Sequence, residues 1–129
     1  MRISVFLFAA AAVVSSLVQA AGDEARGKAL YETRCMICHT INENRIGPMH
    51  KGLFGRKAGS VPGFDYSQPV KDSKLVWDEK NVEQWLAFPD NVIPGQKMGF
   101  YVPDAQERAD IIAYLKQQLA NKPPEIPGY

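Results

Sequence analysis

Two segments near the ends of the chain carry apolar residues at helical spacing. Asp23 is a good N-cap, and residues 24–34 after it predict a short helix. A second helix is predicted from the capping-box spacing of Asp104 and Glu107, and its apolar stripe consists of Ile111, Ile112, Tyr114, Leu115 and Leu119. Asn121 and Pro123-Pro124 are expected to stop it. Gly27 lowers the helix propensity of the first segment by about 1 kcal/mol relative to alanine. We therefore expect the backbone of the C-terminal helix to cross closely at Gly27.

The middle of the chain predicts two further short helices separated by loops. One runs from Asp78 to about Phe88, with Val82, Trp85 and Leu86 facing inward and Pro89 ending it. Ser67, followed by Gln68-Pro69, is typical of the start of another helical turn. Between residues 40 and 66, glycine and proline recur at short intervals, and no period-two run of strand length is found. The pattern predicts an all-α fold with long loops, which need something to wrap around.

The first twenty residues predict a secretory signal peptide. Met1-Arg2 is a short basic start, residues 3–14 are almost entirely apolar, and Val18-Gln19-Ala20 supplies small residues before a cleavage after Ala20 or Ala21. The apolar run is shorter than the ~20 residues that cross a membrane, although an uncleaved anchor stays open. We expect residues 1–20 to be removed, residues 21–129 to form one domain, and the protein to be periplasmic without stable membrane insertion.

The charge balance of this domain excludes some classes of partner. Residues 1–20 hold Arg2 and no acidic residue, so the rest of the chain carries 14 basic and 14 acidic residues. A nucleic-acid binder needs an excess of Lys and Arg, and attachment to anionic lipid by charge needs the same. We expect neither, and we expect a monomer.

The main chemical signal is Cys35-Met36-Ile37-Cys38-His39, which uses the chain's two cysteines and one of its two histidines. Cys-x-x-Cys-His is the attachment signature of c-type haem. The spacing brings both sulfurs to one side of a helical turn, where they reach the two vinyl groups of one porphyrin edge, and His39 then turns under the ring to bind iron. The alternative is a structural or thioredoxin-like dithiol. The adjacent histidine and a spaced methionine favour haem.

The sixth iron ligand decides the function, because an open position binds gases or peroxide while a thioether favours electron transfer. Three methionines follow the signal segment: Met36, Met49 and Met98. Met98 follows a Pro94-Gly95 turn that holds its loop over the face opposite His39. We predict that Met98 is the ligand. His50, the remaining histidine, is expected to be an exposed loop side chain.

With these residues in place, the chain resembles the class I cytochromes c, of the mitochondrial and small bacterial periplasmic type, from about Asp23 to Leu119. Beyond the attachment motif, the resemblance is carried by these blocks: Gly47-Pro48, residues 52–57, Pro62-Gly63-Phe64 with Tyr66, Trp77, Pro94-Gly95 with Lys97-Met98 and Phe100, and residues 113–116.

The resemblance implies a cytochrome c fold around one haem c. The implied thioether residues are Cys35 and Cys38, and the implied iron ligands are His39 and Met98. It further implies that the Pro48 carbonyl accepts the ring N–H of His39, and that Tyr66, Trp77 and Arg56 neutralise or hydrogen-bond a buried propionate. Two departures stand out: Trp85 occupies the place of a tyrosine near the methionine sulfur, and Val70 that of an asparagine.

The expected function is that of a soluble, exported electron carrier whose iron cycles between Fe(III) and Fe(II), and not that of an enzyme. The expected donor is a reductase or dehydrogenase, and the acceptor is an oxidase or reductase. The ring of basic residues that surrounds the haem edge in mitochondrial relatives is only partly matched, by Arg34, Arg45 and Lys97, with Asp90 at one of its positions. Electrostatic steering is therefore expected to be weak. Two alternatives remain: a permanent subunit of an exported dehydrogenase, and a haem enzyme or gas sensor.

Overall fold

The computed structural model describes residues 21–120. Its helical segments are α1 (Glu24–Leu30), the π-helix η1 (Tyr31–Cys35), α2 (Gln68–Asp72), α3 (Glu79–Ala87), α4 (Pro89–Val92) and α5 (Ala105–Ala120). Within the described range there is no strand, and Lys57 and Val76 form an isolated antiparallel bridge. The all-α prediction is confirmed. The predicted signal peptide and the predicted helix stop at residues 121–124 lie outside the described residues.

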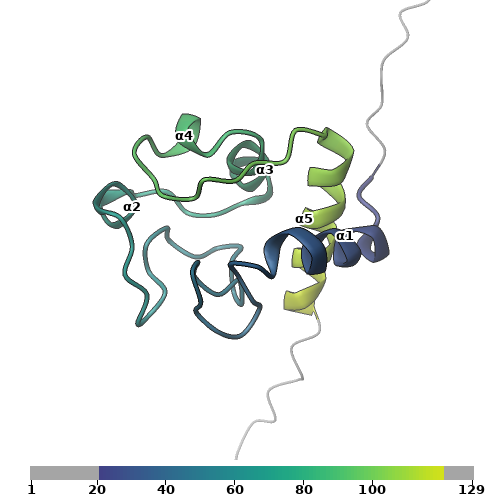
Figure 1. Cartoon of the computed structure of the whole chain (residues 1–129), viewed down its shortest axis with the longest axis horizontal. Coiled ribbons are helices and arrows are strands. Elements are labelled where there is room, and N and C mark those ends of the chain that lie inside the picture. The colour runs from purple at the N-terminus through teal and green to yellow at the C-terminus, as the bar shows by residue number, and fades with distance from the viewer. Residues whose placement is uncertain (1–20, 121–129) are drawn as a thin grey trace, which may run out of the picture.

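The helices near the two ends of the chain cross at one side of the molecule, with α2 and α4 on the other (Figure 1). A Cβ atom on Gly27 would lie 1.9 Å from the Asp110 carbonyl oxygen and 3.0 Å from the Cβ atom of Tyr114. The rings of Tyr31 and Tyr114 lie 5.2 Å apart in the same contact. The close backbone crossing predicted from Gly27 is therefore confirmed.

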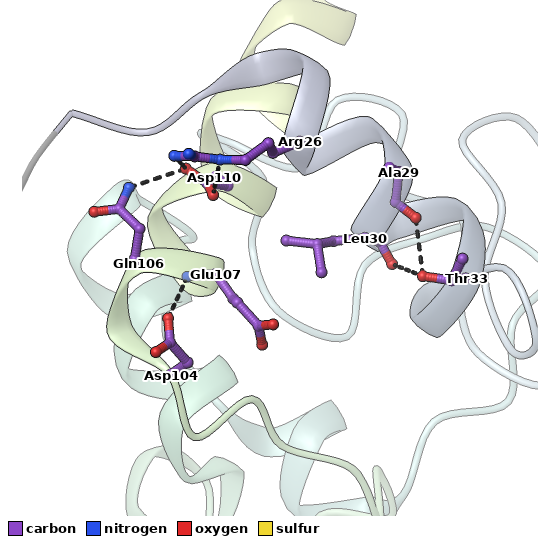
Figure 2. A pocket seen from close by; sticks show the side chains of 8 residues that line it. All are labelled: Arg26, Ala29, Leu30, Thr33, Asp104, Gln106, Glu107 and Asp110. Carbon is purple, nitrogen blue, oxygen red and sulfur yellow. Dashed lines mark hydrogen bonds and ion pairs between the residues drawn. The ribbon is translucent and has the colours of Figure 1, made fainter.

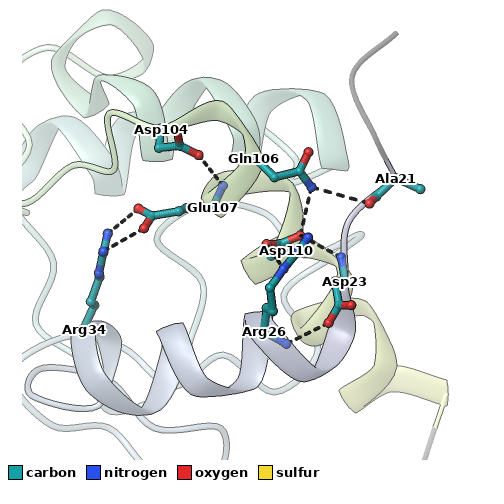
Figure 3. Close-up of polar contacts among 8 residues, drawn as sticks. All are labelled: Ala21, Asp23, Arg26, Arg34, Asp104, Gln106, Glu107 and Asp110. Atoms are coloured by element: carbon teal, nitrogen blue, oxygen red, sulfur yellow. Dashed lines mark hydrogen bonds and ion pairs between the residues drawn. The ribbon is translucent and has the colours of Figure 1, made fainter.

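A network of polar contacts around Asp110 also joins α1 to α5 (Figure 3). The Asp110 side chain is almost fully buried and accepts hydrogen bonds from the Asp23 N–H at 2.7 Å, from Arg26 Nε at 3.0 Å and from Gln106 Nε2 at 3.0 Å. Burial by itself would raise the pKa of Asp110. The hydrogen bonds from these three groups together outweigh burial and lower the pKa below its usual value.

We expect Asp110 to stabilise the fold in a pH-dependent way. Because its folded pKa is lowered, its contribution is complete above the unfolded pKa of about 3.9 and is lost as pH falls through the lower folded value. Asp110→Asn should be less stable than the parent at pH 7, and the difference should narrow below about pH 4. Denaturant unfolding of both proteins across this range measures it, and a difference independent of pH would contradict the assignment.

The second ion pair of the crossing lies nearer the end of the π-helix. Arg34 donates two hydrogen bonds to the Glu107 carboxylate, at 2.5 and 2.8 Å. One half of the predicted capping box is present, because the Glu107 N–H donates to the Asp104 carboxylate at 2.8 Å. The Glu107 side chain pairs with Arg34 instead. Arg34 matches one of the basic positions around the haem edge, but here its charge is paired with that of Glu107.

A pocket of about 500 Å³ opens between α1 and α5, lined by Arg26, Ala29, Leu30, Thr33, Asp104, Gln106, Glu107 and Asp110 (Figure 2). Its polar groups are already paired: Thr33 Oγ1 donates to the Ala29 carbonyl at 2.9 Å, and Arg26 pairs with Asp110. It contains none of the predicted haem residues. The pocket is therefore a feature of the helix crossing rather than a site.

Two local features depart from the predicted helices. The predicted helix over residues 24–34 is α-helical only in α1, and its second part is the π-helix η1. At the end of η1 the Met36 N–H donates to the Tyr31 carbonyl at 3.1 Å. Helix α3 matches its predicted bounds, but Pro89, expected only to end it, occupies the first turn of α4. Within residues 21–120 no helix combines the length and hydrophobicity needed to span a membrane.

Candidate haem site

The Cys35–His39 segment forms a helical turn at the end of η1. The Cys38 N–H and the His39 N–H both bond to the Cys35 carbonyl, at 3.0 and 2.8 Å. Both cysteines are free thiols and partly buried, whereas Met36 and Ile37 between them are exposed. Both cysteines thus lie on one helical turn and are less exposed than the two residues between them, which fits attachment to one porphyrin edge.

The environment of the first thiol bears on the dithiol alternative. Burial raises the pKa of the Cys35 thiol to about 11. Reactive Cys-x-x-Cys dithiols work through a lowered thiol pKa, because the thiolate is the nucleophile. The surroundings of Cys35 therefore do not provide the lowered pKa on which a reactive dithiol depends.

The His39 side chain is oriented for a bond to a metal through one nitrogen. Its Nδ1–H donates to the Pro48 carbonyl at 2.7 Å, which leaves the Nε2 lone pair free. Burial lowers the pKa of His39, opposed in part by the hydrogen bond to Pro48, so the ring is held in the neutral form that binds metals. Gly47 lies against this ring, since a Cβ atom there would be 2.2 Å from His39 Cε1.

The Met98 side chain is held by a donor from α3. Trp85 Nε1–H donates to Met98 Sδ at 3.0 Å, and the Trp85 ring packs edge-on against Trp77 at 5.2 Å. The Met98 N–H bonds to the Gln96 side-chain oxygen. The turn before it contains Gly95 with φ +82°, a conformation that favours glycine. The hydrogen bonding around the sulfur therefore comes from an indole, as the departure at Trp85 implied.

The two chain segments that carry the predicted iron ligands run through different halves of the molecule (Figure 1). The segment between α4 and α5, which carries Met98, runs through the upper half in Figure 1. The loops that follow Cys35 and include His39 fill the lower half. This arrangement fits ligands that approach one ring from its two faces.

Among the residues that the structure describes, two buried side-chain atoms lack any hydrogen-bond partner: Arg56 Nε and Ser67 Oγ. The other Arg56 nitrogens donate to the Lys51 and Met49 carbonyls at 2.8 and 3.1 Å. Burial lowers the pKa of Arg56, and nearby Tyr66 opposes that shift. Unsatisfied buried donors are rare in native proteins and mark the place of a missing partner. An anionic group such as a propionate would fit these two donors.

The comparisons agree with the geometry. A family model described as "Cytochrome c" matches residues 24–118. The chain is 40% identical over 120 residues to cytochrome c2 of Rhodomicrobium vannielii, covering 90% of this chain and 95% of that protein. It is 43% identical over 101 residues to cytochrome c of Gibberella zeae, covering 75% and 95%. The solved structure of cytochrome cH from Methylobacterium extorquens matches with a TM-score of 0.70 and 42% identity, covering 74% of this chain and 99% of that one.

The chain belongs to the cytochrome c family.

Cytochromes c are electron carriers rather than enzymes, and their cofactor is covalently bound haem c with its iron. The residues of this chain fit haem c. Cys35 and Cys38 are free thiols on one turn, and the neutral His39 ring has a free Nε2. Two buried donors lack a partner within the described protein. Ser67 was predicted only as a helix cap, yet its side chain makes no cap hydrogen bond. The sequence did not indicate this buried, unpartnered hydroxyl, since a serine before a helix is explained by capping alone.

The prediction for His50 was wrong. Its side chain is partly buried rather than exposed, and its Nδ1 lies 3.0 Å from the Tyr31 hydroxyl. Its ring stacks on the His39 ring with centroids 4.3 Å apart and an interplanar angle of 19°. Burial lowers the pKa of His50 well below its usual value, with His39 and Arg56 adding to the effect. The loop thus folds inward and brings His50 against the cytochrome's candidate ligand.

Proposed function

We propose that this cytochrome c carries single electrons with His39 and Met98 as the two axial ligands of its iron. The observation that carries the proposal is the pair of oriented ligand atoms: His39 Nε2, left free by the Pro48 hydrogen bond, and Met98 Sδ, held by Trp85. An imidazole with a thioether favours electron transfer over substrate binding, because neither iron position stays open.

Each residue has a distinct part in this proposal. Cys35 and Cys38 tether haem c from one turn, and haem supplies the one-electron couple between Fe(III) and Fe(II) when bound. Pro48 fixes the orientation of His39 and increases its basicity by accepting the Nδ1–H. Trp85 holds the Met98 sulfur in place through its indole N–H. Arg56 and Ser67 donate to a propionate, which stabilises a charge that would otherwise be buried without a partner.

We further propose a periplasmic location and docking with redox proteins. The basic, then apolar, N-terminal segment supports export. The donor is a reductase or dehydrogenase, and the acceptor is an oxidase or reductase. Pairing of Arg34 with Glu107 removes one basic group from the docking surface. Rates of electron transfer should therefore fall only modestly between low and moderate ionic strength, and a steep fall would contradict this docking mode.

Voltammetry of the purified holoprotein tests the proposal. We expect a reversible one-electron couple without any substrate, and slow binding of carbon monoxide and cyanide at neutral pH because Met98 must first leave. Rapid binding of either ligand would instead favour a haem enzyme or gas sensor. Recovery of the protein alone, rather than with a large dehydrogenase, would separate a free carrier from a permanent subunit.

A further inference from the structure

A polar pair lies in the interior between the helix crossing and the candidate iron ligand. Tyr31 is only 2% exposed, and its hydroxyl lies 3.0 Å from His50 Nδ1. The two rings meet edge-on with centroids 5.6 Å apart. Burying a hydroxyl and an imidazole is unfavourable unless they bond to one another, and here they do. A phenylalanine and a leucine would fill the same space without that requirement.

The pair also connects two parts of the molecule through stacked rings. Tyr31 packs on Tyr114 of α5 at 5.2 Å, and His50 stacks on His39 at 4.3 Å. Among the described ring contacts and hydrogen bonds, the connection from Tyr31 to His39 runs through His50. The Pro48 carbonyl fixes one nitrogen of His39, and the near-parallel His50 ring restricts rotation of its plane.

We propose that His50, held in place by Tyr31, is a positioning residue that fixes the plane of the His39 ring and lowers the reduction potential of the iron. The inference rests on the proposed function, in which His39 is an iron ligand. The physical reason is the charge difference between the two oxidation states. Ferric haem carries one more positive charge than ferrous haem, so polar groups beside the ligand stabilise the ferric form relative to an apolar surrounding.

The test measures midpoint potentials of the holoprotein at one fixed pH for His50→Leu, Tyr31→Phe and the double variant. We expect His50→Leu to raise the potential by about 28 mV or more, which is about a threefold change in the ferric-to-ferrous ratio at about 59 mV per tenfold. Tyr31→Phe should raise it less. The double variant should match His50→Leu alone, because Tyr31 acts through His50. Electron paramagnetic resonance of the ferric form should show altered g values in His50→Leu, since they report the orientation of the His39 plane.

A matched control is Tyr114→Phe, which removes a hydroxyl from the same ring cluster without touching His50, and it should leave the potential unchanged. A potential unchanged in His50→Leu, or shifts that add independently in the double variant, would overturn the inference. A single variant leaves one polar group of the pair without its hydrogen-bond partner and can fail to fold. In that case the potential of the double variant, compared with the parent, is the test, because the double variant buries no unpaired polar group. A parent holoprotein without a histidine–methionine spectrum would refute the proposed function instead.

Discussion

Replacing Met98 with alanine is expected to abolish the weak long-wavelength band that an iron–sulfur bond gives to the oxidised protein. The thioether stabilises the ferrous state, so its loss should also lower the midpoint potential. We expect at least about a hundredfold change in the ferric-to-ferrous ratio, or about 120 mV, because axial ligands are a dominant control of haem potential. The opened position should bind carbon monoxide and cyanide much faster than the parent does.

The matched control for this prediction is Met49→Leu. Met49 follows Pro48 along the chain, and its described hydrogen bonds come from its backbone: the N–H donates to Asn44 Oδ1 and the carbonyl accepts from Arg56. The leucine variant should keep the band and the parent potential. Retention of the band in Met98→Ala, with its loss in Met49→Leu, would move the sixth ligand to Met49 and refute the proposed ligand set.

Gly27→Ala is expected to be among the most destabilising small substitutions in the chain. The added Cβ atom would lie 1.9 Å from the Asp110 carbonyl oxygen, and a backbone atom of α5 cannot move aside as a flexible side chain can. The helix-propensity gain of about 1 kcal/mol is too small to offset the forced separation of α1 and α5. We expect a net loss of about 3 kcal/mol or more in the free energy of unfolding, at the upper end of overpacking costs.

Denaturant unfolding of the holoprotein measures this loss, and Gly99→Ala is its control. Gly99 undergoes the same chemical change, but no protein atom beyond its two chain neighbours lies within 4 Å of the added Cβ, and its φ is not positive. Its stability should stay within about 0.5 kcal/mol of the parent. Equal stability of the two variants would mean that the helices do not cross at Gly27.

The parts of the fold that could be predicted from sequence are those with a local physical signal. Gly27 is unfavourable in a helix, so its presence indicated a close crossing. Asp78 and Phe88 bracket α3 because capping and proline chemistry act over a few residues. The role of Pro89 was harder to predict, because a proline that ends one helix can also occupy the first turn of the next. The π-helical turn of η1, in which Tyr31 is the buried residue, has no local signal in the sequence that separates it from a continuing α-helix.

The same distinction holds for the candidate site. The attachment motif is contiguous, so Cys35, Cys38 and His39 are evident as a group, and a proline-glycine turn indicates Met98. His50 was missed because its partners, Tyr31 and His39, are 19 and 11 positions away along the chain. Ser67 was predicted only as a helix cap, because a serine before a helix has a sufficient local explanation. A residue whose role depends on partners far along the chain requires the structure.

The mass of the denatured protein from its native host tests the central claim most directly. We expect the mass of the polypeptide plus one haem, with neither Cys35 nor Cys38 available to a thiol reagent before or after reduction. A colourless chain of bare polypeptide mass, with both cysteines joined in a disulfide that reduction frees, would contradict it.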